Sequence, residues 1–491
     1  MVSPVLVIVT EYFGVATISY WEFSLMFVYV LGLYVFFSRQ KQMRIAAEPE
    51  YAYFLWGLFA KILGGVFFSL IYFYYYNGGD TIGYFFSALP ISKLAKENVF
   101  QALTVLFGAN SVENQAYFTM ETGKPLDFMY YDSRTYTVIR LIAPFIFISF
   151  DSYLITTTLV ASFSYIGPWR GFQTLSHYFP SIRGKLAIAF LFMPSAVFWG
   201  SGLLKDTFTF SATCWSIHCV DSIFFRKRDL VSSSLALALS FYIILAIKPY
   251  IFMVLFPLIL LWLFYQRLAR IRNALIKFII LPAAFLSLVA GSFLVLQALG
   301  DRLDKFSLDN ALDTIIISQQ DMKRAEEYGS NYFDVGTMEH SWVSVLSKFP
   351  VATNAALFRP YLWECRNLVM TLAGLENLFL LVLAITLLLR SRVVFLFTMI
   401  TKNPLVTICV TFTLLYGFIT GITTPNFGAL VRFKIPLLPF FVAGCYIMLH
   451  LLDLRSQAIR SGRPFFFEQY AKGEPVARPA GPSKRNRRKD R

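Results

Sequence analysis

Long apolar runs, separated by short polar stretches, fill most of the sequence up to about residue 452. A helix that crosses a bilayer needs about 20 predominantly apolar residues. Runs that reach or approach this length lie at residues 18–37, 51–76, 152–167, 186–202, 206–225, 230–247, 250–265, 277–298, 368–390, 403–424 and 435–452. The pattern therefore predicts an all-α polytopic membrane protein with about 11 transmembrane helices.

Two long polar loops, at residues 77–151 and 299–367, interrupt this pattern. In the second loop, Ser307 to Tyr328 has a serine start, an acidic first turn and a glycine directly after its end, which is typical of a helix. Ser341 to Lys348 is predicted as a further helix. Two roles fit such a loop equally well, a cover that selects a substrate and a rigid lid without chemistry.

The composition places the chain among membrane proteins. Of its 491 residues, 57% are hydrophobic and 15% are charged, and the mean hydropathy is +0.58. Soluble globular proteins carry about 25% charged residues, so the soluble class is excluded. The first apolar segment lacks a basic start and a small-residue cleavage site, so we expect it to stay in the membrane.

Lys and Arg are concentrated in the loops on one side of the predicted helices. Residues 38–50, 168–185, 226–229, 265–277 and 390–402 together hold sixteen Lys or Arg against three Asp or Glu. Such an excess in short loops marks the cytoplasmic side. Residues 77–136 hold four against six, and residues 299–365 hold six against ten, so both long loops are expected outside. Eleven crossings then put the N-terminus outside and the C-terminus in the cytoplasm.

The segment from Tyr136 to Phe150 is apolar but has Arg140 near its middle. If it crossed the membrane, every later loop would change sides and the basic loops would face outward. We therefore expect it to be a helix that lies in the outer membrane interface.

The C-terminal tail, residues 455–491, is the most basic part of the chain. It holds eleven Lys or Arg against three Asp or Glu, a balance of +8 within the net charge of +15. Its Pro, Gly and charge content predicts disorder. Because the tail directly follows a membrane domain that spans residues 1–454, its expected partners are anionic lipids rather than nucleic acid.

A polar turn, Asn77-Gly78-Gly79-Asp80, ends the apolar run 51–76. The turn presents a carboxylate at the outer surface beside the aromatic residues Tyr74 to Tyr76. An Asn-Gly-Gly helix stop with tyrosine anchors is also ordinary at a membrane interface. Whether Asp80 is a functional carboxylate or part of an ordinary helix stop depends on the other charges predicted at the outer surface.

Several cations violate the charge rule because they lie at outer turns between predicted spans. Lys205, Lys248, Arg432 and Lys434 are of this kind, and Arg359 lies near the membrane re-entry of the second loop. Such cations either pair with acids or bind an anion at the outer surface. The acids available for pairing are Asp206 and Glu364.

A carboxylate and several cations at one membrane surface suit sugar transfer from a lipid-linked phosphate. The reaction needs a base that takes a proton from the acceptor hydroxyl, and positive charge that holds the departing phosphate. Asp80 and Asp206 are the catalytic candidates. The candidates for phosphate binding are Lys205, Arg432, Lys434 and Arg359, with Glu364, Lys248 and Arg140 as further candidates.

An outer Asp after an early membrane helix, followed by a surface helix, resembles the GT-C superfamily of polyprenyl-phosphate-dependent glycosyltransferases. Arg432 to Phe440, with Pro436 and Pro439, is similar to the Arg-x-x-x-Pro-x-x-Pro stretch that opens the last helix in many bacterial members. Residues 198–206 and 357–364 look like patterns from uncharacterised bacterial proteins of this broad type. The resemblance implies a bacterial inner-membrane enzyme of surface glycan assembly. Many GT-C enzymes carry paired acids in the first outer loop, whereas Asp80 has no acidic neighbour, which leaves metal use open.

No cofactor or metal site is predicted. The five cysteines and four histidines are scattered, and the pair Cys214 and His218 supplies only two ligands. A polysaccharide polymerase or ligase with a lipid diphosphate donor, a transporter or flippase for lipid-linked or anionic cargo, and a membrane scaffold stay open as alternatives. A transporter should have paired broken helices and charges near the middle of the membrane. In the sequence, Lys61 is the clearest charge inside a span.

Overall fold

The computed structural model describes residues 18–269, 291, 308–323, 331–462 and 464–465. Helices form the regular structure in these ranges, which contain no strand, and an antiparallel bridge joins Tyr332 to Asn426. The predicted all-α class is confirmed.

In the described ranges, six helices are long and apolar enough to cross a membrane. They are α2 (Tyr20–Arg44); η1 (Pro49–Tyr53), α3 (Phe54–Leu70) and η2 (Ile71–Tyr75) as one helix; α14 (Leu230–Ile247); α21 (Leu368–Arg390); α23 (Pro404–Thr423); and α24 (Phe427–Phe433), η9 (Ile435–Leu437) and α25 (Leu438–Arg460) as one run. A seventh results if α8 (Ser133–Ile148) and the pair α9 (Tyr153–Ser164) and α10 (Ile166–Tyr178), which meet at 114°, form one bent span. The described chain therefore has the helices of a membrane protein.

The remaining predicted spans are shorter, broken or undescribed. Residues 186–202 form α11 (Arg183–Ala187), η4 (Ile188–Phe192) and α12 (Pro194–Trp199), because Pro194 has no N–H to continue a helix. Residues 206–225 form α13 (Lys205–Val220) and η5 (Asp221–Arg226), whose Ser and Thr residues lower the hydropathy. α15 (Pro249–Ala269) covers 250–265, whereas 277–298 lies outside the described residues apart from Gly291.

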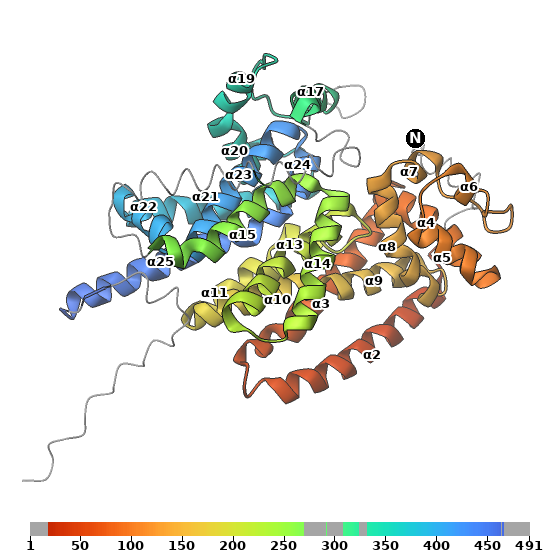
Figure 1. Ribbon diagram of the computed structural model, residues 1–491, viewed down its shortest axis with the longest axis horizontal. Coiled ribbons are helices and arrows are strands. Elements are labelled where there is room, and N and C mark those ends of the chain that lie inside the picture. The colour runs from red at the N-terminus through yellow and green to blue at the C-terminus, as the bar shows by residue number, and fades with distance from the viewer. Residues whose placement is uncertain (1–17, 270–290, 292–307, 324–330, 463, 466–491) are drawn as a thin grey trace, which may run out of the picture.

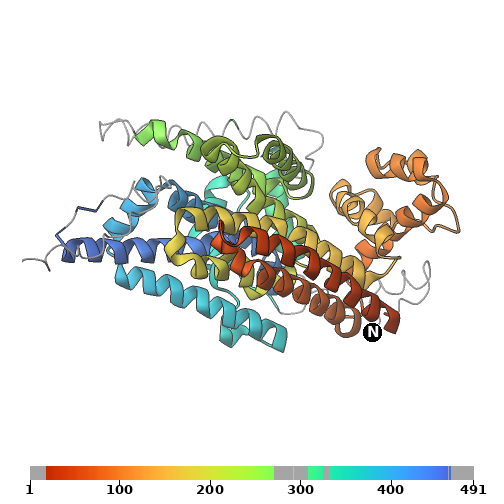
Figure 2. The same cartoon turned by 90° about the horizontal axis from the view of Figure 1, so that it is seen from below.

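The first long loop, residues 77–151, is more ordered than its polarity predicts. It contains α4 (Asp80–Glu97), α5 (Val99–Phe107), α6 (Val112–Gln115) and α7 (Asp127–Tyr130), and it runs into α8. Most of α4 is buried, and α4 packs against α8. The orange helices of this loop lie at one end of the bundle in Figure 2. The segment expected in the interface, Tyr136 to Phe150, is helical as α8, and its place relative to a bilayer stays a prediction.

The second long loop, residues 299–367, has a small core in its described part. It contains α17 (Leu308–Asp321), α19 (Trp342–Ser347), α20 (Phe349–Phe358) and η8 (Leu362–Glu364). The first three of these helices lie beside α23 and α24 in Figure 1. Leu312, Phe333 and Val345 are buried there against residues of α20 and α24. The Ser341 hydroxyl accepts a hydrogen bond from the Ser344 N–H, so the predicted start of α19 is confirmed. The predicted helix from Ser307 is confirmed over α17, and both of its predicted limits lie outside the described residues.

Four helix ends converge where the candidate charges lie. α4 begins at Asp80, α13 begins at Lys205, α14 ends immediately before Lys248, and α24 carries Arg432 near its end. A short η3 (Pro180–Ile182) and α22 (Val393–Lys402) complete the described helices. The fold therefore gathers segments that are hundreds of residues apart in the chain.

Candidate functional site

Arg432 on α24 joins two carboxylates from different helices. Its Nε lies 2.6 Å from Oδ2 of Asp206 on α13, and its Nη1 lies 2.7 Å from Oδ2 of Asp80 on α4. The Asp206 side chain is 0% exposed, whereas the Asp80 side chain is 55% exposed. The two predicted catalytic carboxylates are thus brought together by one guanidinium, and Asp80 is the one that solvent reaches.

Lys248 completes the charge balance around the buried carboxylate. Its Nζ donates a hydrogen bond to Oδ1 of Asp206, so both oxygens of Asp206 are bound by cations. The same ammonium lies 4.2 Å from the ring centroid of Phe433. A carboxylate held on both oxygens orients its two cations and is not available as a base.

Lys205 binds a third carboxylate, which the sequence did not single out. Its Nζ lies 3.3 Å from Oδ2 of Asp132, the N-cap residue of α8. Burial disfavours the charged form of Asp132, but the Thr135 hydroxyl, the Lys205 ammonium and the Arg134 N–H outweigh it and hold the pKa of Asp132 below its usual value. The signal in the sequence was the Asp before a helical stretch, a common N-cap pattern.

The aromatic residue that interacts with Asp80 is not one of the expected tyrosines, Tyr74 to Tyr76. Tyr72 interacts electrostatically with both Asp80 and Arg432 and stacks on Phe68, with ring centroids 4.4 Å apart. Tyr74 and Tyr75 are exposed. Asp80 thus interacts electrostatically with Tyr72, which precedes the expected stretch Tyr74–Tyr76. The chain continues as a π-helix through Ile71–Tyr75 and turns only at Asn77.

The turn before Asp80 requires glycine at one position. Gly79 has φ of +111°, and a Cβ there would lie 2.9 Å from Cε1 of Tyr72. Both the backbone conformation and the close ring exclude a larger residue without rearrangement. Gly79 is also the N-cap residue of α4, so the turn fixes where the Asp80 carboxylate emerges.

The Arg432 cluster consists of Arg432, Asp80, Asp206 and Lys248. The other predicted site residues bind partners outside this cluster. Arg359 Nε lies 3.1 Å from Oε2 of Glu364, and its guanidinium lies over the Phe333 and Phe427 rings. This pair connects the second long loop to α24. It is a tie between elements, with no contact to Asp80 or Asp206 among its described partners.

Lys434 and Arg140 are also engaged by protein oxygens. Lys434 is 0% exposed, and its Nζ lies 2.5 Å from Oδ1 of Asn377 and 3.4 Å from the Leu357 carbonyl. Arg140 donates from Nε to the Val105 carbonyl at 3.3 Å and from Nη2 to the Gly108 carbonyl. The predicted phosphate-binding residues are thus divided. Arg432 binds Asp206, and Lys205 lies next to Asp206 in the chain. Arg359 and Lys434 instead connect helices and loops of the protein to one another.

Metal ligands do not gather in the described part of the chain. No group of three or more His, Cys, Asp or Glu there could hold a metal ion. The five cysteines are all free thiols. His218, which the sequence pairs with Cys214 as a possible metal ligand, forms a hydrogen bond of 2.9 Å with Thr174.

No protein-family model matches this sequence, and comparison with curated proteins and with solved structures gives no match either. The chemistry of the site must therefore be inferred from this chain's own residues.

Proposed function

We propose that the protein is a GT-C-like glycosyltransferase that transfers a sugar from a polyprenyl-phosphate donor to an acceptor. It acts at the extracytoplasmic face of a bacterial inner membrane, in surface glycan or cell-envelope assembly. In this proposal the chain crosses the membrane eleven times, with its N-terminus outside and its basic tail at anionic lipids in the cytoplasm. The six helices of sufficient length and apolarity among the described residues support the membrane location.

The observation that carries the proposal is the contrast between the two carboxylates on Arg432. Asp206 is buried and bound by two cations, so it serves to fix Arg432 and Lys248. Asp80 is more than half exposed and contacts Arg432 through one oxygen. We therefore assign Asp80 as the general base and Asp206 as the residue that positions the cations.

A donor phosphate would compete with Asp80 for the guanidinium of Arg432. When the phosphate binds Nη1 and the neighbouring Lys205, Asp80 is released and can accept the proton of the acceptor hydroxyl. The acceptor oxygen then forms a bond to the anomeric carbon while the bond from that carbon to the phosphate oxygen breaks. The leaving polyprenyl phosphate keeps the electron pair, and Arg432 and Lys205 stabilise its charge.

The test compares Asp80→Asn with Asp127→Asn in membranes that receive a radiolabelled polyprenyl-phosphate sugar. Asp127 lies in the same outer loop and pairs with Lys124 on the surface, so its amide variant is a matched control. Loss of a general base should lower product formation by about 100-fold or more. Wild-type product from well-expressed Asp80→Asn protein would refute the base assignment.

A lipid diphosphate donor, as used by polysaccharide polymerases and ligases, is a second candidate. Lys248 and Arg432 bind Asp206, and Lys205, the residue before Asp206, binds Asp132. A diphosphate would engage more of these three cations than a monophosphate. Offering monophosphate and diphosphate donors with the same sugar separates the two reactions.

Transport of lipid-linked or anionic cargo is favoured by a different observation. The segment α11–η4–α12 is broken, and Lys61 and Glu376 are buried charges within apolar helices. A transporter would move labelled lipid-linked sugar across proteoliposomes without consuming it. Formation of a glycosidic product in the same vesicles would exclude transport as the sole activity.

A further inference from the structure

The short helix α12 lies between two breaks in an apolar segment. Pro194 begins it after the π-helix η4, and Gly200 follows its last residue, Trp199. Residues 200–204 then lead directly into α13, whose first two residues are Lys205 and Asp206. The position of α12 therefore influences where these two charges enter the site.

Two buried side chains, one acidic and one basic, bind the two ends of α12. At its beginning, the Ser195 N–H donates a hydrogen bond of 2.7 Å to Oε2 of Glu376 on α21. At its end, Nζ of Lys61 on α3 donates a hydrogen bond to the Gly200 carbonyl. Glu376 is 5% exposed and Lys61 is 4% exposed, so water screens neither contact effectively.

The signs of these charges match the electrostatics of a helix. Backbone N–H groups at the beginning carry partial positive charge, and carbonyl groups at the end carry partial negative charge. A carboxylate at Ser195 and an ammonium at Gly200 each complement the end that they bind. Removing either side chain would leave a buried backbone group without its hydrogen-bond partner.

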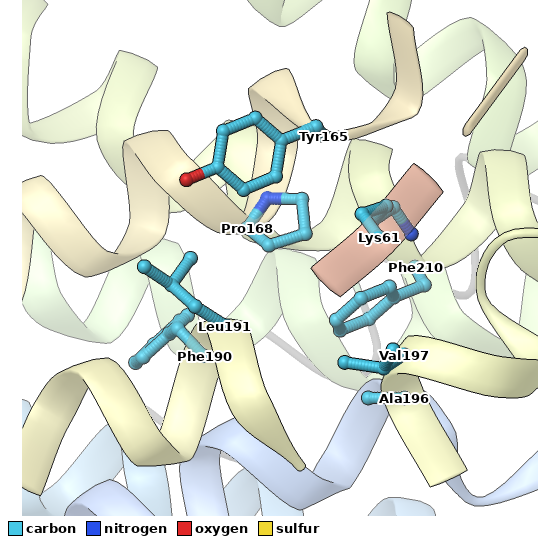
Figure 3. A pocket seen from close by; sticks show the side chains of 8 residues that line it. All are labelled: Lys61, Tyr165, Pro168, Phe190, Leu191, Ala196, Val197 and Phe210. Carbon is cyan, nitrogen blue, oxygen red and sulfur yellow. The ribbon is translucent and has the colours of Figure 1, made fainter. Parts of the chain in front are cut away.

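Close backbone packing holds α12 against α3. A Cβ on Gly64 would lie 2.3 Å from the Val197 carbonyl oxygen, so only glycine permits this approach. Figure 3 shows the same region, in which Lys61 lines a small cavity together with Ala196, Val197 and Phe210. Nζ of Lys61 also lies 5.3 Å from the centroid of the Phe210 ring on α13. Lys61 thus contacts both the end of α12 and the helix that carries Asp206.

Hydrogen bonds of residues 201–207 connect the end of α12 to the beginning of α13. Ser201 donates from its hydroxyl to the Val197 carbonyl at 2.6 Å, and the Gly202 carbonyl accepts a hydrogen bond from the Thr207 hydroxyl at 2.6 Å. α12 also packs against α24, which carries Arg432. α12 is therefore linked to both elements of the Arg432–Asp206 ion pair, to α24 by packing and to α13 through residues 200–204.

We propose that Glu376 and Lys61 are positioning residues that hold α12 at both ends and thereby set the geometry of Lys205 and Asp206 around Arg432. The role in geometry rests on the structure alone. Its effect on catalysis rests on the proposed function.

The first test measures geometry without any substrate. Ser201 is 0% exposed, so a Ser201→Cys probe in a Cys365→Ser background should react slowly with a membrane-impermeant maleimide. Adding Lys61→Met should accelerate labelling by about tenfold or more, because α12 loses the partner at its end. Lys185→Met is the matched control, since Lys185 also lies over an aromatic ring but in α11. Equal labelling with and without Lys61→Met would overturn the proposal.

The second test separates positioning from simple loss of folded protein. Lys61→Met and Glu376→Leu should raise the KM for the lipid-linked donor by about tenfold, because displaced cations bind phosphate less well. Lys61→Arg, which keeps a donor and a charge, should restore much of the affinity. A fall in maximal rate alone, with unchanged KM, would contradict positioning. If the wild type forms no product while the labelling contrast is observed, the proposed function fails and the role of α12 stands.

Discussion

Lys248 forms a buried ion pair with Asp206, which precedes it by 42 residues in the chain. Neither side chain is appreciably exposed, and Asp206 is in addition bound by Arg432. Removing one member of such a group destabilises a protein more than replacing the whole group by apolar residues, because the remaining charges stay buried without compensation.

Asp206→Ala should therefore destabilise the protein strongly, by about 3–5 kcal/mol. The measurement is the thermal transition of the purified protein in detergent. Lys124→Ala, which removes a surface partner of Asp127, should shift the transition little and serves as the control. A double variant, Asp206→Leu with Lys248→Met, should recover part of the loss. A transition of Asp206→Ala close to that of the wild type would contradict the assigned ion pairs.

Gly79→Ala should lower stability and displace Asp80. A φ of +111° with extended ψ is accessible essentially to glycine alone, and the new methyl group would meet the Tyr72 ring. We expect a loss of about 1–3 kcal/mol together with reduced product formation. Gly32→Ala is the control, since a Cβ at Gly32 meets no atom within 4 Å. If both alanine variants behave alike, the turn does not have the described conformation.

Acidification should weaken the contact between Asp132 and Lys205. The pKa of Asp132 is lowered in the folded protein, so its stabilising effect is fully present above the unfolded pKa of about 3.9 and is lost as the pH falls through the folded pKa. Thermal transitions of wild type and Asp132→Asn should differ most near neutral pH, and the difference should shrink below about pH 4. A difference that stays constant down to pH 3 would mean that Asp132 is not ionised in this contact.

Cysteine labelling tests the predicted orientation. In a Cys365→Ser background, Met120→Cys in the first outer loop should react with an impermeant maleimide in intact spheroplasts. Arg228→Cys, between η5 and α14, should react only after permeabilisation. Both native residues are exposed, so burial cannot account for a difference. The reverse pattern would place the Arg432 cluster at the cytoplasmic face.

Where apolar residues run without interruption, hydropathy predicted long helices that the structure confirms, as in α14, α21 and α23. The stretch 186–202 is also apolar, but it is broken at Pro194, which has no N–H to continue a helix. A mean hydropathy over many residues does not register this single missing group. α4 was missed for the opposite reason. Its apolar residues are interspersed with Thr, Ser and Lys, and burial against α8 rather than against lipid stabilises it.

The sequence placed Asp80, Lys205, Asp206, Lys248 and Arg432 on one side through the charge rule, and the structure brings four of them into one chain of contacts around Arg432 and Asp206. Which carboxylate is accessible could not be predicted, because exposure depends on helices distant in sequence. Lys434 illustrates the limit. It lies two residues from Arg432, yet its partners are Asn377 and backbone carbonyls.

The spacing of Asp206 and Arg432 sets an order of events while the chain is being made. Asp206 can pair with Lys248 soon after both are synthesised, but Arg432 follows Asp206 by 226 residues. At ribosomal speeds of about 5–20 residues per second, this interval lasts about 10 to 45 seconds. For that time Asp80 is present without the guanidinium to which it later binds. The nascent membrane domain must therefore tolerate an incomplete charge cluster, and the site closes only when the last spans are inserted.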